Sequence, residues 1–247
     1  MNIHLAADYK IHITFNPVYS FGGKLMSVGL TTHFLHGSAN VAAPLDLLLP
    51  QLDQTQRIIV LQAQINIVEK HNGFFRSNCV KVSLKMDEML AMAVMTNEFI
   101  ARKLDALEFL ELEINEVFPG IKHGANDPAL LALSERFDLS LENYGSGKVS
   151  SKAVYDNMFA SVKLDKGFVQ HNIKRLSFKP FITALLENIK PHCQSIIVQG
   201  VDDVSALKRV RYFDFDGVQS LLFSSVNEDA LHSLIESPAI LPAIHQQ

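Results

Sequence analysis

The chain has 247 residues, of which 48% are hydrophobic and 19% are charged. This apolar content is sufficient for a buried core and excludes an intrinsically disordered chain. The 22 Lys and Arg residues face 26 Asp and Glu residues, and the resulting formal net charge of −4 argues against broad electrostatic binding to nucleic acid.

Membrane and secretion signals are missing from the sequence. No apolar run approaches the roughly 18 residues that a membrane span requires. The first residues also lack the basic and apolar segments of a signal peptide. Cys79 and Cys193 are too few for a disulfide framework or a thiolate metal site. These features predict a reduced, cytoplasmic, globular protein.

Strand-like and helix-like segments alternate along the sequence. Strands over 11–15 and 24–33 flank the Gly22-Gly23 turn, which predicts an opening hairpin. A helix over 53–70 follows, with Asp53 as its N-cap. The remaining predicted elements are, in chain order, a strand over 80–84, a Met-rich helix over 87–104, a strand over 109–114, a helix over 127–136, a strand over 139–142, a helix over 150–158, a strand over 161–165, a helix over 177–189, a strand over 195–199, a helix over 203–212, a strand over 218–223 and a helix over 227–235. The tail 237–247 contains two prolines and does not continue the last helix.

Repeated strand–helix units indicate parallel strands with helices outside them. About eight strands in about 240 residues is the number that a closed α/β barrel requires. The alternative is a doubly wound open sheet. No linker, low-complexity segment or charge block divides the sequence. We therefore expect residues 1–247 to form one domain, a modified TIM-like (β/α) barrel.

The chemistry of such a barrel lies at the C-terminal ends of its strands. Carboxylates there would suit a divalent cation, whereas a lysine ammonium repels one. The polar residues predicted at these ends are mixed, namely Thr31, Thr32, Lys81, Ser83, Glu113, Glu116, Glu142, Asn143, Lys163, Asp165 and Gln199. This mixture indicates a barrel mouth held by ion pairs and hydrogen bonds.

Two further features have open alternatives. Gly145-Ser146-Gly147 fits a plain turn between strand and helix, or a loop that presents N–H groups to a phosphate. The stripe of Met86, Met89, Met92 and Met95 fits core packing, or a groove that binds a partner.

Several segments resemble, in the same order, the EAL domain of bacterial cyclic-di-GMP phosphodiesterases. The pairs are 15–18 with Tyr-Gln-Pro-Ile, 112–116 with Leu-Glu-Ile-Thr-Glu, 142–147 with Asp-Asp-Phe-Gly-Thr-Gly, 162–165 with Leu-Lys-Ile-Asp, and 198–202 with Ala-Glu-Gly-Val-Glu. The resemblance extends from Phe15 to about Val226 and implies an EAL-type barrel with an antiparallel first strand. In that family two divalent cations activate the water that cleaves the phosphodiester.

The catalytic positions depart from the family pattern. The resemblance implies that the signature Glu has become Thr31, the substrate-binding Arg has become Leu35, and a metal-binding Asn has become Lys81. The other vestigial positions are Glu142 and Asn143 in place of two aspartates, Gln199 in place of a glutamate, and the matching residues Glu113, Lys163 and Asp165. We therefore expect no catalysis and no resident metal or cofactor.

A charge replacement follows as a hypothesis. Because the family places Lys81 and Glu113 near one cation, we expect the Lys81 ammonium to pair with Glu113 and with Glu142. This pairing would keep the mouth neutral without a metal.

Finer similarities, such as those in 109–112, 114–116 and 164–166, point to a branch of small degenerate EAL proteins of enteric bacteria. Members of that branch bind the FlhD subunit of the flagellar activator FlhD–FlhC and block its action on DNA. The resemblance implies a negative regulator of motility genes that contacts a protein partner and binds neither DNA nor membrane. The partner surface has no motif in the sequence. The alternatives are a residual phosphodiesterase and a non-hydrolysing sensor of cyclic-di-GMP, although Leu35 in place of Arg argues against the sensor.

Overall fold

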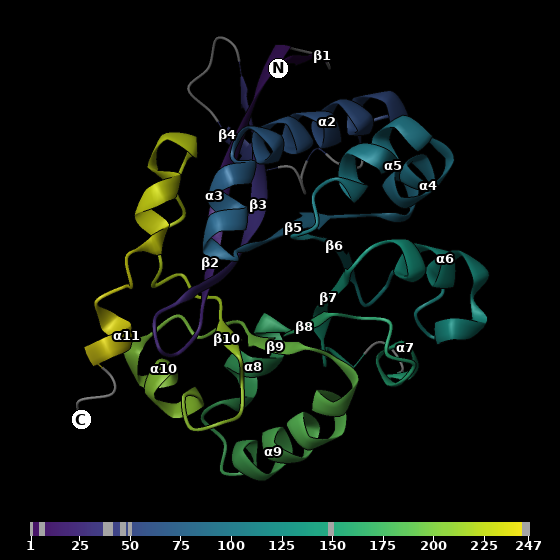
Figure 1. Cartoon of the computed structure of the whole chain (residues 1–247). Helices are drawn as coiled ribbons and strands as arrows, with labels where there is room; N and C mark the ends of the chain where they lie inside the picture. Colours follow the sequence, from purple (N-terminus) through teal and green to yellow (C-terminus); the bar gives the residue numbers. More distant parts are fainter. Residues whose placement is uncertain are drawn as a thin grey trace.

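The computed structural model describes residues 2–4, 8–36, 42–44, 48, 51–147 and 151–243. In these ranges eight strands close into one barrel, in the order β2-β10-β9-β8-β7-β6-β5-β3 and back to β2 (Figure 1). They are β2 (Asp8–Tyr19), β3 (Leu25–His36), β5 (Lys81–Lys85), β6 (Leu110–Asn115), β7 (Leu139–Tyr144), β8 (Ser161–Leu164), β9 (Ser195–Val198) and β10 (Gly217–Val218). The predicted closed barrel is confirmed, and the doubly wound open sheet is wrong.

The first barrel strand runs against its neighbours. β2 pairs antiparallel with both β3 and β10, whereas the pairs from β3 through β5 to β10 are parallel. This confirms the expected antiparallel first strand and the opening hairpin. After β10 the chain returns to β2, where Phe15 and Val226 exchange backbone hydrogen bonds of 2.8 and 3.1 Å.

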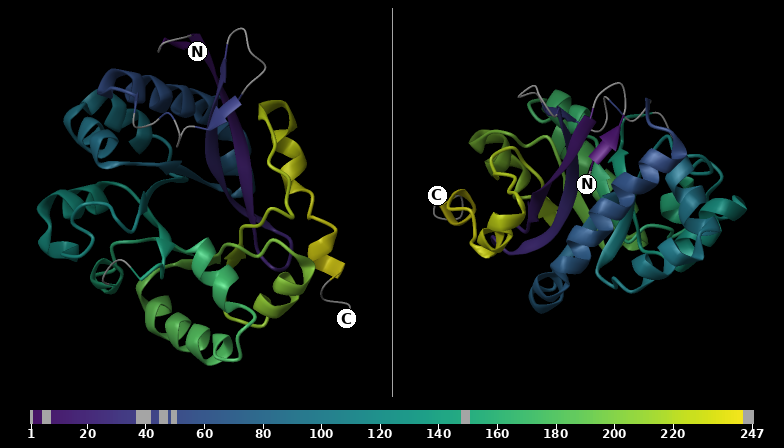
Figure 2. Two further views of the ribbon diagram at one scale, coloured as in Figure 1. Left: turned by 180° about the vertical axis from the view of Figure 1, so that it is seen from behind. Right: turned by 90° about the horizontal axis from the view of Figure 1, so that it is seen from above.

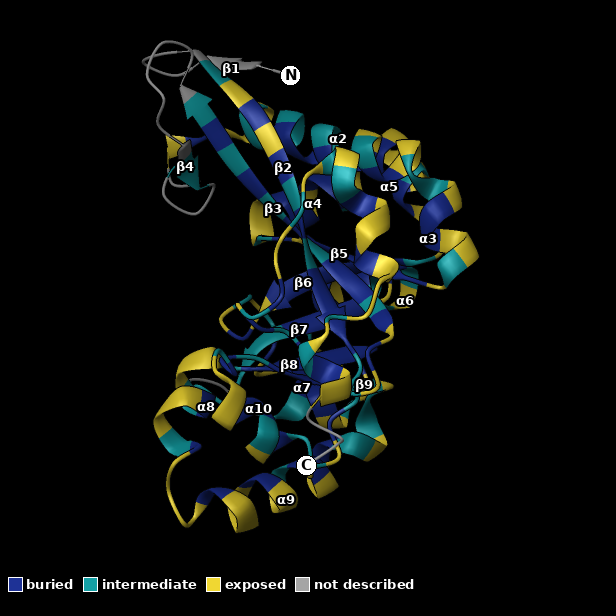
Figure 3. Cartoon of the chain, turned by 90° about the vertical axis from the view of Figure 1, so that its left-hand side faces the viewer, coloured by how far each residue is buried: buried dark blue, intermediate teal, exposed yellow. Residues whose placement is uncertain are grey.

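The β2–β3 hairpin is longer than the sequence predicts. β2 continues through Pro17, which lies opposite Val28, because antiparallel pairing does not require an N–H at every position. The hairpin extends beyond the barrel, and there it pairs with the short strands β1 (Asn2–His4) and β4 (Ala42–Pro44) (Figure 3).

Helices surround the barrel on its outside (Figures 1 and 2). They are α2 (Gln54–Lys70), α3 (Asn72–Asn78), α4 (Glu88–Thr96), α5 (Glu98–Asp105), α6 (Pro128–Arg136), α7 (Lys152–Tyr155), α8 (Lys166–Asn172), α9 (Phe178–Ile189), α10 (Val204–Val210), α11 (Ile240–Ala243) and the 3-10 helices η2 (Gly124–Asn126), η3 (Lys190–His192) and η4 (Glu228–Ile235). Among the helices in the described ranges, none combines the length and the apolar content that crossing a membrane would take.

Several predicted elements differ in the structure. The single helix predicted over 87–104 is two helices, because the Asn97 side chain accepts hydrogen bonds from the N–H groups of Phe99 and Ile100 and so starts α5. The strand predicted over 218–223 has only its first residue in β10. The helices α3, α8 and α11 were not expected from the sequence. In the tail, α11 folds back and buries Leu241 completely.

The alternation within the strands explains why both faces of the barrel are buried. In β6, Leu110, Leu112 and Ile114 face the surrounding helices, while the alternate residues Glu111 and Glu113 are also buried and bond to side chains of other strands. Polar residues therefore fill much of the barrel interior, and the buried hydrophobic residues of strands and helices form one core cluster.

Candidate functional site

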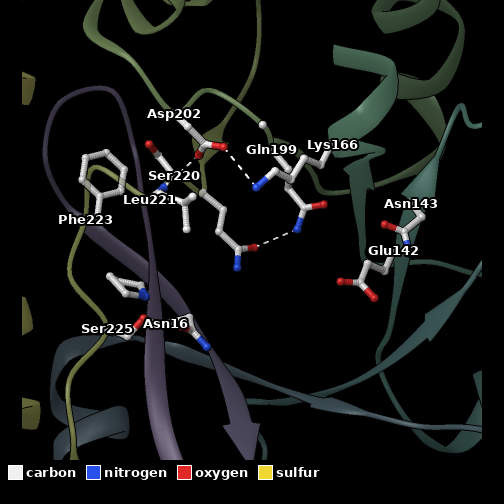
Figure 4. Close-up of a pocket in the computed structure, with 13 residues that line it drawn as sticks. Asn16, Glu142, Asn143, Lys166, Gln199, Asp202, Ser220, Leu221, Phe223 and Ser225 are labelled. Atoms are coloured by element: carbon white, nitrogen blue, oxygen red, sulfur yellow. Dashed lines mark hydrogen bonds and ion pairs between the residues drawn. The ribbon is translucent and has the colours of Figure 1, made fainter. Parts of the chain in front are cut away.

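A polar pocket of about 220 Å³ opens at the C-terminal ends of the strands (Figure 4). Amide side chains from four strands or strand ends line much of it, namely Asn16, Asn143, Gln199 and Gln219. The Gln199 Nε2 donates to Oε1 of Gln219 over 3.0 Å. Glu142 is a carboxylate at this pocket, and Figure 4 shows its side chain across from Gln199.

A buried ion pair lies in the barrel interior beneath the pocket. The Lys163 Nζ donates to Oε2 of Glu113, and their side chains are 2% and 5% exposed. The two residues come from β8 and β6, with β7 between them, so the contact crosses the interior. Buried charges of opposite sign are retained only when they compensate each other, and here they do.

A second lysine neutralises Glu142. The Lys85 Nζ lies 3.3 Å from Oε1 of Glu142. Burial raises the pKa of the Glu142 carboxyl above its usual range, and repulsion from Glu113 raises it further, whereas attraction to Lys85 and Lys163 works in the opposite direction. The mouth therefore contains two carboxylates, each in contact with its own ammonium group.

The expected role of Lys81 is wrong. Lys81 begins β5, and its Nζ lies 2.6 Å from Glu111 and 3.6 Å from Asp138. Since four residues of strand span about 13 Å, Lys81 lies at the opposite end of β5 from Lys85. The lysine of this strand that faces a carboxylate of the mouth is Lys85, one residue beyond the predicted end of the strand at Leu84.

Lys81 belongs to a separate polar layer at the N-terminal ends of the strands. Ser161 Oγ donates to Glu111 over 2.9 Å and also lies 2.7 Å from the Ser140 hydroxyl. Burial alone would lower the pKa of Lys81, but the attraction and hydrogen bonds of Glu111 and Asp138 together outweigh it, so the pKa is raised. These contacts hold the N-terminal ends of the strands together, and their residues do not line the polar pocket.

The vestigial signature position lies beside the pocket. The Asn16 Nδ2 donates to Thr31 Oγ1, and the Ser225 hydroxyl donates to Oδ1 of Asn16. A neutral hydrogen-bonded chain therefore stands where the family resemblance places a carboxylate. Leu35 lies four residues farther along β3, half-buried opposite Lys10 and Ala42 on the hairpin extension, and it does not line the pocket.

Asp165 has a structural role. Its Oδ1 accepts a hydrogen bond of 2.5 Å from the N–H of Phe168, which makes it the N-cap of α8. Nearby, the Asp202 carboxylate accepts from Leu221 N–H at 2.9 Å and lies 3.1 Å from the Lys166 Nζ (Figure 4). Both carboxylates are thus already engaged by groups of the chain.

The residues at this mouth do not fit the two divalent cations that the EAL resemblance implies. Glu113 and Glu142 each face an ammonium group, and a cation bound between them would be repelled at close range. Thr31, Asn143 and Gln199 bring no negative charge, and the Asp165 carboxylate is engaged as the N-cap of α8. Over the described ranges, no three His, Cys, Asp or Glu side chains cluster in a way that would hold a metal ion.

The structure also places the Gly145-Ser146-Gly147 segment and the methionine stripe, each of which has two interpretations from sequence. Gly145 and Gly147 have φ of 95° and 84°, as a turn at the end of β7 requires, and the next helix begins only at Lys152. Residues 148–150 lie outside the described ranges. In the methionine stripe, Met86 is buried, whereas Met89 and Met92 are 40% and 61% exposed on α4.

The residues of the mouth that were not expected as site residues include Lys85, Asn16 and Gln219. The period-two alternation places Lys85 on the same strand face as Lys81 and Ser83, so extending the strand by one residue would have found it. Asn16 and Gln219 stood within motifs of the family resemblance but were not assigned to the pocket.

Comparison with known proteins gives a consistent set of relatives. No family model matches the chain. YdiV of Escherichia coli (strain K12) is 31% identical over 236 residues, which cover 96% of this chain and 100% of that protein. The anti-FlhC(2)FlhD(4) factor YdiV of Salmonella paratyphi B is 28% identical over 228 residues, covering 92% and 96%. The crystal structure of the EAL-like domain protein YdiV superposes with a TM-score of 0.86 at 31% identity, covering 92% of this chain and 97% of that one.

Proposed function

This chain belongs to the family of EAL-like YdiV proteins, and from this relationship we propose that it is a negative regulator of flagellar gene expression that binds the FlhD–FlhC transcription activator. We propose further that the FlhD subunit makes the contact and that the bound activator is kept from its DNA. The similarity extends over nearly the whole of both chains, which supports transfer of the function of the anti-FlhC(2)FlhD(4) factor.

The observation that carries the proposal is the state of the barrel mouth. Two lysines, Lys85 and Lys163, hold the carboxylates that a phosphodiesterase would use for metal, and Leu35 lies outside the pocket. The chain keeps the barrel fold, whereas lysines neutralise the carboxylates that catalysis would need at its mouth. Such a barrel is left to act by binding a partner. The protein is therefore a catalytically inactive EAL-like regulator that acts through protein–protein contact.

Location and domain organisation follow from the same proposal. The partner acts on chromosomal DNA, so we place the protein in the cytoplasm. We also propose that residues 1–247 act as one EAL-like domain, since no described element stands apart from the single barrel. With a net charge of −4, the protein would act on the activator without binding DNA itself.

Titration of the purified protein into FlhD–FlhC tests the proposal. We expect a stable complex by size-exclusion chromatography and calorimetry. If the two proteins elute separately at micromolar concentration, the proposed partner is wrong. Turnover of cyclic-di-GMP in the presence of Mg²⁺ or Mn²⁺ would instead support the phosphodiesterase.

A further inference from the structure

A groove of about 800 Å³ lies on the outside of the barrel and shares no lining residue with the polar pocket of the mouth. The connection between α8 and α9, the first turn of α9 and the length of α10 form it, on the side of the barrel away from α2 and α5 (Figures 1 and 2). Its floor includes the buried side chains of Ile173 and Phe178. We name it the α9–α10 groove.

The rim of the α9–α10 groove exposes large apolar side chains. Leu176 is 100% exposed, Tyr212 is 76% exposed and Val204 is 44% exposed. Single exposed apolar residues are common on protein surfaces, but a cluster around a concave apolar floor marks an interaction site. Tyrosine is also frequent among the residues that dominate binding energy in interfaces.

The charge of the α9–α10 groove has one sign. Arg175, Lys179, Lys208 and Arg209 line it, and no acidic residue does. Within the described ranges, Arg175, Lys179 and Arg209 form no ion pair with a carboxylate; the guanidinium of Arg209 donates to the backbone oxygen of Ile173 at 3.3 Å. A basic groove on a chain with net charge −4 is a local feature that attracts acidic groups.

We propose that the α9–α10 groove is a docking surface for an acidic amphipathic helix of a protein partner. The apolar face of that helix would cover Leu176, Tyr212 and the floor, and its carboxylates would meet the rim cations. Helices and loops line the groove and no open strand edge does, so the fit is to a helix laid in a groove and not to an added strand. Apolar rim residues give nothing to a phosphate backbone, which disfavours nucleic acid.

This inference deepens the proposed function, because it rests on a protein partner and assigns the surface that the partner uses. Two full-length double variants test it. Arg175→Glu with Lys179→Glu reverses the rim charge and places acids before and within the first turn of α9, where they favour the helix. Leu176→Ala with Tyr212→Ala removes the apolar rim. Thermal melting and circular dichroism establish that each variant is folded.

Matched controls lie elsewhere on the surface. Lys24→Glu with Lys122→Glu makes the same change of net charge at exposed positions outside the groove, and Met92→Ala with Phe99→Ala removes exposed apolar side chains from α4 and α5. Each protein is titrated by calorimetry with FlhD–FlhC. It is also titrated, by fluorescence anisotropy, with a synthetic helical peptide that carries leucines on one face and glutamates on the other, and with a DNA duplex.

Both groove variants should weaken binding of FlhD–FlhC and of the peptide by at least about tenfold, and neither control should. If wild type binds FlhD–FlhC and the groove variants bind equally well, the groove inference is overturned while the proposed function stands. If wild type ignores FlhD–FlhC but binds the peptide through the groove, the proposed function fails and the groove inference stands. Binding of the DNA duplex that is lost in the charge-reversed variant, without peptide binding, would overturn the groove inference in favour of nucleic acid.

Discussion

Removal of the Lys163 ammonium perturbs the barrel interior most directly. In Lys163→Met, the Glu113 carboxylate, which is 5% exposed, would remain in the interior without the cation that it contacts. An uncompensated buried charge of this kind costs about 3–5 kcal/mol. For a domain of this length, that loss corresponds to a fall in Tm of roughly 6–20 °C.

A double-mutant cycle measures this coupling. Urea unfolding followed by circular dichroism gives the free energy of unfolding of wild type, Lys163→Met, Glu113→Gln and the double variant. Each single change leaves one buried partner alone, so the double variant should lose less stability than the sum of the two, with a coupling energy of about 1–3 kcal/mol. Additive losses, or a Lys163→Met protein as stable as wild type, would refute the ion pair as a support of the barrel.

Three further predictions concern single side chains. Burial and repulsion from Glu113 raise the pKa of Glu142 in the folded protein above its value in the unfolded chain. The contribution of Glu142 to the free energy of unfolding is therefore greatest at low pH and is lost as the pH rises through the pKa of the folded state. The stability of Glu142→Gln relative to wild type should therefore increase as the pH rises above about 4, the ordinary pKa of a glutamate, in urea titrations at several pH values. Asn97→Ala removes the side-chain cap of α5 and should cost about 1 kcal/mol, or about 2–4 °C in Tm. Gly200→Ala should lower Tm by more than Asn97→Ala does. Gly200 has φ of +76°, and a Cβ there would lie 2.6 Å from the Lys166 carbonyl oxygen.

Each of these has its own control. A pH-independent difference between Glu142→Gln and wild type would contradict the raised pKa. For the α5 cap, Asn97→Ser keeps an acceptor and should retain most of the stability that Asn97→Ala loses. For Gly200→Ala, the control is Gly73→Ala in α3, where an added Cβ meets no atom within 4 Å. An equal change in Tm for the two variants would contradict the steric argument.

The closed barrel could be predicted from the sequence because it depends on strand count and on repeated strand–helix order. Asp53 and Asp127 are capping residues at predicted helix starts, and both caps form. Strand ends were less predictable, since β2 passes through Pro17 and β5 extends to Lys85, in each case because neighbouring strands supply the pairing. The short helices α3 and α8 have too few residues to show a helical period.

The site was partly predictable for a related reason. The sequence predicts which residues lie at strand ends. The side chains that they contact depend on which strands are neighbours in the barrel and on the residue at which each strand begins. A shift of four residues along β5 separates the expected lysine, Lys81, from the lysine that faces Glu142. The α9–α10 groove could not be predicted, because its residues come from three segments that only the folded barrel brings together.

A DNA-binding competition measures whether the protein separates the activator from its promoter. FlhD–FlhC is bound to a flagellar promoter fragment, the protein is added in increasing amounts, and the retained DNA is measured by electrophoretic mobility shift. We expect the activator–DNA complex to be lost as the protein approaches stoichiometry with the activator, and the protein alone to cause no shift of the DNA. An activator–DNA complex that persists at a large excess of folded protein would contradict this expectation.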